Sequence, residues 1–145
     1  MLVTPTGFQQ KTLDVRTGNG LDDVLLEPLI YRSSDGRLFR APVGSTTDGL
    51  SIPKVFQNIP GFSPAGGIDW FCGVLHDSAY RDFLEIWNGT DWMKASLDRS
   101  ACDWLILDAM EAQGVGIIRR HTIYAALRIG GGTAFMEDRK QHPAK

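Results

Sequence analysis

The chain of 145 residues contains 43% hydrophobic and 22% charged residues, and its formal net charge at pH 7 is −2. This length and composition are typical of one globular domain with a single hydrophobic core. The small negative charge argues against a nucleic-acid-binding protein, which usually presents a basic face. No apolar run approaches the roughly 20 residues of a transmembrane helix, and the N-terminus lacks the layout of a signal peptide. We therefore expect a protein without a transmembrane segment, located in the cytoplasm where it is made.

After an N-terminal segment of residues 1–20, residues 21–47 predict a small antiparallel sheet. The apolar run around Pro28 predicts a strand that lies at a sheet edge or contains a bulge, because proline cannot donate a ladder hydrogen bond. The sequence SSDG at residues 33–36 predicts a hairpin turn, with positive backbone angles at its Asp and Gly. Residues 48–66 are rich in Gly, Pro and Ser and predict a long loop, which is typical beside a binding site.

The second half of the chain predicts a helical part at residues 67–131, followed by a charged, frayed tail at residues 132–145. The residues between the first two helices include Trp87 and Trp92 and predict a loop over the rim of a pocket. We therefore predict an α+β fold in one domain, with a small N-terminal antiparallel sheet packed against a C-terminal three-helix layer. The predicted helices run from Ile68 to Leu84, from Ser96 to a stop at Gly114, and from Ile117 to Ile129.

The two cysteines, Cys72 and Cys102, fall on the first two predicted helices. If these helices pack antiparallel with His76 level with Asp103, the two cysteines are offset by about 7 Å along the axis. Together with an interaxial distance of roughly 8–10 Å, this offset exceeds the reach of a disulfide. We therefore expect two buried thiols that are not bridged.

His76 is the first candidate for chemistry. Spacings of three and four place it on one stripe of its helix with Cys72, Ala79 and Tyr80, so its ring should point inward. Asp77 lies one step around the helix. An inward imidazole beside a carboxylate can transfer protons or help to hold a metal. The alternative is a hydrogen-bonded core histidine without a catalytic role.

Asp103 shares a stripe of the second helix with Leu107 and Met110. A carboxylate on an apolar stripe is costly unless it is paired, so a buried partner is implied, and His76 is the natural candidate. Tyr124 and Arg128 on the third helix are placed to hydrogen-bond the carboxylates. The alternative for Arg128 is an interaction with the C-terminus of its own helix.

Four motifs, at residues 47–53, 75–81, 102–110 and 126–130, together resemble a family of small phage and prophage proteins whose domain has no assigned function. Its signature is a TDGxSIP loop, an HDxxYR helix, and two further helices. The loop motif includes Asp48 and Ser51, and the resemblance implies that Ser51 supports the candidate site. The chain departs from the family pattern at Leu50, Cys102 and Ile106, and none of these positions is charged. The resemblance implies a phage or prophage origin, with synthesis in the host cytoplasm and contacts to virion or tail proteins.

The sequence FCGVLHDSAYR at residues 71–81 also resembles the core of secretory-type phospholipases, especially their short bacterial members. The resemblance implies that His76 activates a water molecule, Asp77 binds calcium, Asp103 orients the histidine and Tyr80 supports that aspartate. The cysteine here precedes the histidine by four residues rather than three. The glycine-rich calcium loop of those enzymes is not recognisable.

These features lead to three classes of function. The first is a metal-assisted hydrolase acting on phospholipid or cell wall of the host envelope, with a divalent cation such as Ca²⁺ held by Asp77 and Asp48. A ligand set of His76, Asp77 and Asp48 would instead suit zinc. The second class is a non-catalytic phage structural or tail-associated protein, in which the His, Asp and Arg side chains form a structural network. A protein that binds a host factor is a third option.

Overall fold

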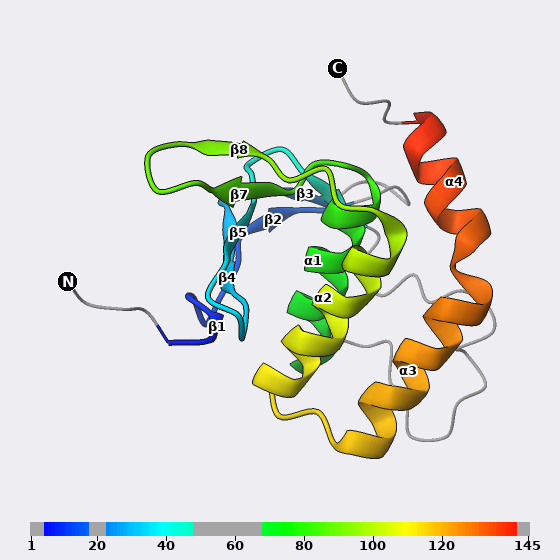
Figure 1. Cartoon of the computed structure of the whole chain (residues 1–145). Helices are drawn as coiled ribbons and strands as arrows, with labels where there is room; N and C mark the ends of the chain where they lie inside the picture. Colours follow the sequence, from blue (N-terminus) through cyan, green and yellow to red (C-terminus); the bar gives the residue numbers. More distant parts are fainter. Residues whose placement is uncertain (1–4, 18–22, 48–67, 142–145) are drawn as a thin grey trace.

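A computed structural model describes residues 5–17, 23–47 and 68–141. Within them the chain forms two antiparallel sheets and four helices, so the predicted α+β class is confirmed (Figure 1). The larger sheet has the order β1 (Gly7–Phe8), β4 (Leu29–Arg32), β5 (Leu38–Ala41), β7 (Glu85–Trp87) and β8 (Trp92–Lys94). The smaller sheet has the order β2 (Val15–Arg16), β3 (Asp23–Leu25) and β6 (Thr46–Thr47). The helices are α1 (Ile68–Tyr80), α2 (Arg99–Ala112), α3 (Ile117–Gly130) and α4 (Gly132–Gln141).

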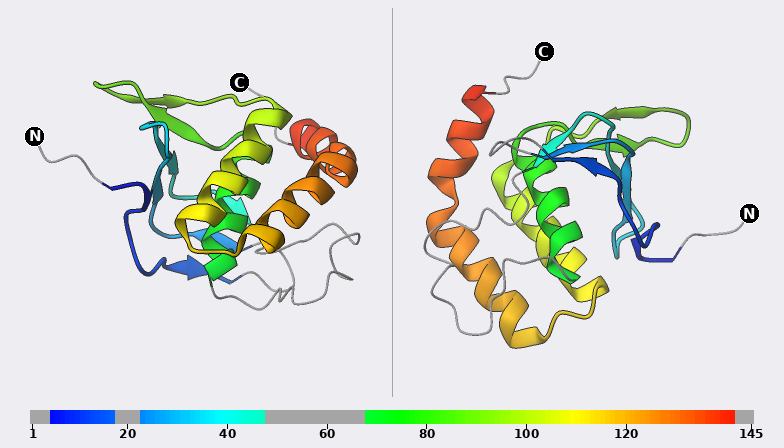
Figure 2. Two further views of the ribbon diagram at one scale, coloured as in Figure 1. Left: turned by 60° about the horizontal axis from the view of Figure 1, so that its bottom comes forward. Right: turned by 180° about the vertical axis from the view of Figure 1, so that it is seen from behind.

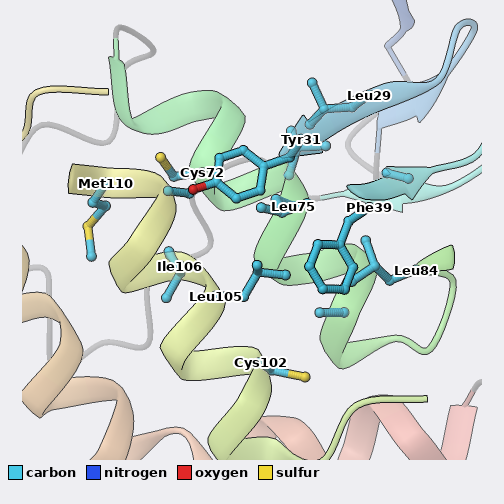
Figure 3. Close-up of a cluster of buried hydrophobic side chains, with 14 of the residues drawn as sticks. Leu29, Tyr31, Phe39, Cys72, Leu75, Leu84, Cys102, Leu105, Ile106 and Met110 are labelled. Carbon is cyan, nitrogen blue, oxygen red and sulfur yellow. The ribbon is translucent and has the colours of Figure 1, made fainter. Parts of the chain in front are cut away.

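The elements form layers, with α1 and α2 side by side between the sheets and the arm made by α3 and α4 (Figures 1 and 2). Apolar side chains from β4 and β5 meet those of α1 and α2 in the core (Figure 3). Tyr31, Phe39, Leu75 and Leu105 are among the fully buried side chains there. This burial fixes α1 and α2 against the sheet, and these two helices carry the candidate site.

The predicted hairpin is present between β4 and β5, where Tyr31 pairs with Phe39. Gly36 takes the positive φ of 88° that the turn requires, whereas Asp35 does not have a positive φ. The prediction for Pro28 was wrong. This residue separates β3 from β4, which belong to different sheets, and β4 lies inside its sheet rather than at an edge.

Residues 85–94 form the β7–β8 hairpin, so the prediction of a loop over a pocket rim was wrong. Trp87 and Trp92 pair across the strands with their ring centroids 5.5 Å apart. The side chain of Asn88 accepts hydrogen bonds from the amides of Thr90 and Asp91, and Gly89 has a φ of 99°. The Asn-Gly pair is therefore the tight turn of a hairpin rather than the stop signal of the preceding helix.

The first two helices are shorter than predicted. Helix α1 ends at Tyr80 because Asp82 takes a left-handed φ of 63°, and the amides of Phe83 and Leu84 turn back to the carbonyl of Ser78. Helix α2 begins at Arg99, because Asp98 is its N-cap and accepts a hydrogen bond of 2.8 Å from an amide in the first turn.

The tail prediction was also wrong, because Gly132–Gln141 form helix α4 and Arg139 is only partly exposed. The arm of α3 and α4 bends at the glycines, and α4 returns to contact α1 (Figure 2). The helical layer therefore holds four helices over the described residues instead of three.

The cysteine prediction is confirmed, since Cys72 and Cys102 are both buried and neither forms a disulfide. Over the described segments, no helix combines the length and the apolar character that crossing a bilayer requires.

Candidate functional site

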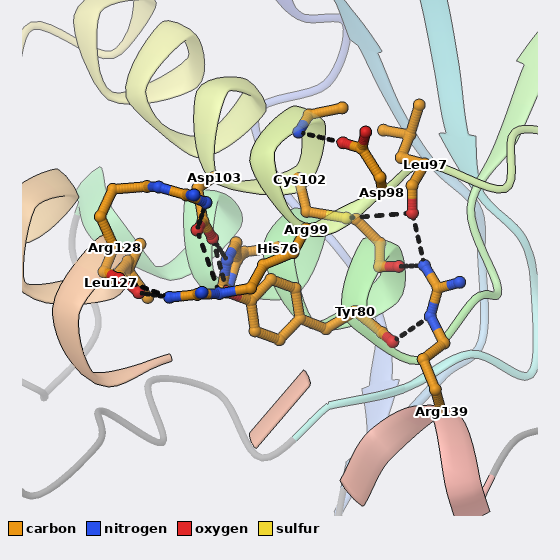
Figure 4. Close-up of polar contacts among 12 residues, drawn as sticks. His76, Tyr80, Leu97, Asp98, Arg99, Cys102, Asp103, Leu127, Arg128 and Arg139 are labelled. Atoms are coloured by element: carbon orange, nitrogen blue, oxygen red, sulfur yellow. Dashed lines mark hydrogen bonds and ion pairs between the residues drawn. The ribbon is translucent and has the colours of Figure 1, made fainter. Parts of the chain in front are cut away.

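The candidate site lies where α1 and α2 run antiparallel, as the end of α1 beside the start of α2 shows (Figure 4). His76 Nε2 lies 3.0 Å from Asp103 Oδ1. The hydroxyl of Tyr80, one turn further along α1, donates a hydrogen bond of 2.6 Å to the same oxygen. His76 is 8% exposed and Asp103 is fully buried at 0%. The predicted pairing of His76 with Asp103 is therefore present.

The second carboxylate oxygen of Asp103 faces two arginines. Arg128 Nη1, from α3, donates a hydrogen bond of 2.8 Å to Oδ2, and Arg99 Nε lies 3.8 Å from the same atom. Arg99 also donates through Nη2 to the carbonyls of Leu127 and Arg128, at 2.7 and 2.6 Å. It thereby caps the C-terminus of α3, where orphan carbonyls need donors. Asp103 thus joins three helices.

The environment of Asp103 keeps it ionised. Burial alone would raise its pKa, but hydrogen bonds from His76, Tyr80 and Arg128 outweigh burial and hold the pKa of Asp103 below its ordinary value. Burial and the neighbouring Asp103 raise the pKa of Tyr80 well above its ordinary range, so this hydroxyl stays protonated and donates.

The ionised carboxylate determines the tautomer of His76. A carboxylate without a proton only accepts hydrogen bonds, so Nε2 of His76 must carry the hydrogen that faces Asp103. In the neutral ring, Nδ1 is then unprotonated and can accept a proton. This is the arrangement of a general base that a buried carboxylate orients.

Asp77 lies beside this pair but has a different partner. Its Oδ2 accepts a hydrogen bond of 2.6 Å from the hydroxyl of Thr47, at the end of β6. Two other predicted residues, Asp48 and Ser51, lie outside the described residues. Over the described part of the chain, no group of three or more His, Cys, Asp or Glu side chains could hold a metal ion. One carboxylate and one hydroxyl fall short of the six to eight oxygens that calcium prefers, so the described donors do not form a calcium site.

The structure brings together four of the predicted side chains, those of His76, Tyr80, Asp103 and Arg128. Tyr124, half-buried on α3, is not among the residues that hydrogen-bond Asp103. Sequence reasoning missed Arg99, although its position one turn before Asp103 on the same helix was a usable signal. It also missed Arg139, for which the sequence offered none.

A second buried carboxylate on α2 has a structural environment. Asp108 accepts hydrogen bonds from the Tyr31 hydroxyl at 2.6 Å and from the Ser34 amide at 2.9 Å. The Ser34 hydroxyl also donates to it. These contacts fasten the β4–β5 hairpin to α2. Burial and Asp108 raise the pKa of Tyr31 above its ordinary range.

Comparison with known protein families gives one result. A family model described as "Protein of unknown function (DUF1353)" matches residues 24–127. The chain belongs to this family. The matched segment of the DUF1353 family runs from β3 through nearly all of α3 and includes His76, Tyr80 and Asp103, whereas α4 lies beyond it. No curated protein and no solved structure matches the chain.

Proposed function

We propose that this protein is a phage-encoded hydrolase in which His76 is the general base and Asp103 orients it. One observation carries the proposal: His76 Nε2 is hydrogen-bonded to an ionised, fully buried carboxylate. A buried imidazole needs a hydrogen-bond partner in either case, but an ionised carboxylate also stabilises the imidazolium that a general base forms. The arrangement is also the one that the resemblance to secretory-type phospholipases implies, with Tyr80 supporting the aspartate.

In the proposed reaction, Nδ1 of His76 takes a proton from a water molecule while the water oxygen bonds to an ester or amide carbonyl carbon. The tetrahedral intermediate then collapses, and the leaving oxygen or nitrogen takes the proton back from Nδ1. Asp103 stabilises the imidazolium that exists between these steps. Tyr80 and Arg128 keep the carboxylate in place, because each donates to one of its two oxygens.

The proposed substrate is host envelope material, either phospholipid or peptidoglycan. The support comes from the phage-like motifs at residues 47–53 and 75–81, since a phage must cross both barriers. The same motifs support synthesis in the host cytoplasm and a place in the virion or tail.

A second candidate function is a non-catalytic phage structural or tail-associated protein. It is favoured by the low exposure of His76, at 8%, and by the fact that Asp103 ties α1, α2 and α3 together. A buried network of this kind can specify one packing without chemistry. The β7–β8 hairpin, where Trp87 is 39% exposed, would then contact other proteins.

The deciding experiment measures hydrolysis of phosphatidylglycerol vesicles and of purified peptidoglycan by the isolated protein, with calcium and with a chelator. We expect turnover of one substrate and a loss of at least about 100-fold in His76→Asn, because general bases contribute roughly 10²–10⁴-fold. His121→Asn is the matched control, since His121 is exposed on α3. Activity that survives His76→Asn would refute the mechanism. Inactivity on both substrates, together with copurification with virions, would favour the structural candidate.

A further inference from the structure

Tyr80 lies against a segment that follows α3. Arg139 donates a hydrogen bond to its backbone carbonyl (Figure 4), Phe135 packs against its ring, and its hydroxyl lies close to Gly131, where an added Cβ atom would be 2.8 Å away. The hydroxyl is the group that donates to Asp103. The segment after α3 therefore contacts a side chain of the candidate site, that of Tyr80.

The backbone contact comes from Arg139 on α4. Its Nε donates 2.9 Å to the carbonyl of Tyr80, and its Nη2 donates 3.1 Å to that of Ala79 and 2.7 Å to that of Leu97. The last carbonyls of a helix lack partners within the helix, so Arg139 caps α1 at the turn that carries Tyr80. It also links the end of α1 to the residues that precede α2.

The ring and the hydroxyl of Tyr80 have their own contacts. Phe135 meets the Tyr80 ring edge to face, with centroids 5.2 Å apart and planes at 81°. The guanidinium of Arg139 lies over the Phe135 ring, 4.6 Å from its centroid. A Cβ atom at Gly131 would lie 2.8 Å from the Tyr80 hydroxyl and 2.6 Å from the carbonyl oxygen of Leu127. Only glycine fits at position 131 without displacing one of them.

We propose that the segment from Gly131 to Arg139 is a positioning element of the candidate site. It fixes Tyr80 so that the hydroxyl holds Asp103 in the orientation that His76 requires. The segment lies outside the residues matched by the family model, so the functional unit of this chain extends beyond them. The catalytic consequence rests on the proposed function, whereas the positioning of Tyr80 does not.

The test uses the full chain with 3-fluorotyrosine and records ¹⁹F NMR spectra, because the three tyrosines give three separate probes. Arg139→Ala should shift the Tyr80 signal, because the hydrogen bond to its carbonyl and the contact with the neighbouring Phe135 ring are both lost. Tyr31 and Tyr124 should keep their signals. The matched control is Lys140→Ala, which changes an exposed neighbour on the same helix and should leave all three signals in place.

Two further variants keep the test decisive if Arg139→Ala folds poorly. Gly131→Ala should move the Tyr80 signal, whereas Gly116→Ala should not, because a Cβ at Gly116 meets nothing within 4 Å. Phe135→Leu removes the edge contact with Tyr80 and the ring beneath Arg139 but leaves the Arg139 hydrogen-bond acceptors in place, so it should give a smaller shift. An unchanged Tyr80 signal in these variants would overturn the proposal. Equal changes at Tyr80 and Tyr31 would also overturn it, since they would indicate general loosening.

An activity assay distinguishes a failure of this proposal from a failure of the proposed function. If the wild type hydrolyses its substrate, Arg139→Ala should lower kcat about tenfold with little change in KM, because substrate contacts are untouched. A wild type without activity, in which Tyr80 still responds to Arg139→Ala, would refute the proposed function and leave the positioning intact. An active wild type with an unresponsive Tyr80 would refute the positioning alone.

Discussion

Replacing Asp103 by Asn tests whether this carboxylate organises the three helices around it. The substitution keeps the size of the side chain but removes its charge. The remaining amide oxygen can still accept a hydrogen bond from the Tyr80 hydroxyl, which in the wild type lies 2.6 Å from Oδ1. The new NH₂ group would then face the guanidinium of Arg128, which lies 2.8 Å from Oδ2. Two donors would oppose each other, and the charge of Arg128 would lose its counterion.

The expected cost follows from the burial of the two partners. Removing one member of a buried ion pair typically costs about 3–5 kcal/mol. Asp103 is fully buried, but the side chain of Arg128 is 34% exposed and can be partly rehydrated after the substitution. We therefore predict that Asp103→Asn lowers the free energy of unfolding by about 3 kcal/mol, at the lower end of that range.

The measurement is urea-induced unfolding of both proteins at neutral pH, followed by far-UV circular dichroism. The matched control is Asp98→Asn, the same chemical change on the same helix. Asp98 is an N-cap, a position at which Asn and Asp are about equally favourable, so the control should change stability by less than about 0.5 kcal/mol. A cost below about 1 kcal/mol for Asp103→Asn would refute the idea that this carboxylate holds the helices together.

Three further predictions concern pH, the thiols and the second buried carboxylate. The pKa of Asp103 is held below its ordinary value despite burial, so its contribution to stability is complete above about pH 4 and is lost as the pH falls through the lower folded-state pKa. Acid unfolding of the wild type, but not of Asp103→Asn, should show this loss. Burial raises the pKa of Cys102 to about 12, and Cys72 is also buried, so neither thiol should react with a thiol reagent until urea unfolds the chain. Asp108→Ala should cost about 2 kcal/mol in thermal unfolding, because it leaves the buried hydroxyl of Tyr31 without its acceptor, and a cost near zero would contradict the bond.

The parts of the fold that were predicted correctly depend on local signals. The β4–β5 hairpin follows from the turn residues that end at Gly36, and the inward face of α1 follows from helical spacing around His76. The β7–β8 hairpin was missed because each strand has three residues, too few to show alternation, and its turn at Asn88–Gly89 also resembles a helix stop. Helix α4 was missed because its charged sequence lacks an apolar stripe. It is fixed instead by contacts of Arg139 and Phe135 with the end of α1.

The candidate site was also predictable only in part. The pairing of His76 with Asp103 could be predicted, because a carboxylate on an apolar stripe requires a partner and the motif supplied one. The role of Arg128 was one of two alternatives that the sequence left open, and the structure shows its bond to Asp103. The capping of α3 by Arg99 and of α1 by Arg139 joins residues 28 and 59 positions apart. Such long-range contacts depend on how the helices pack, and no local sequence pattern predicts them.

The most direct test of His76 as a general base oriented by Asp103 is the protonation state of the His76 ring. Because Asp103 is ionised and accepts from Nε2, the neutral ring should carry its hydrogen on Nε2 and none on Nδ1. Two-bond ¹H–¹⁵N correlation spectra of the full chain, with the signal assigned through His76→Asn, report this tautomer. We predict an Nε2-protonated ring. A neutral ring protonated on Nδ1 would contradict the account, because that nitrogen could not take a proton from water.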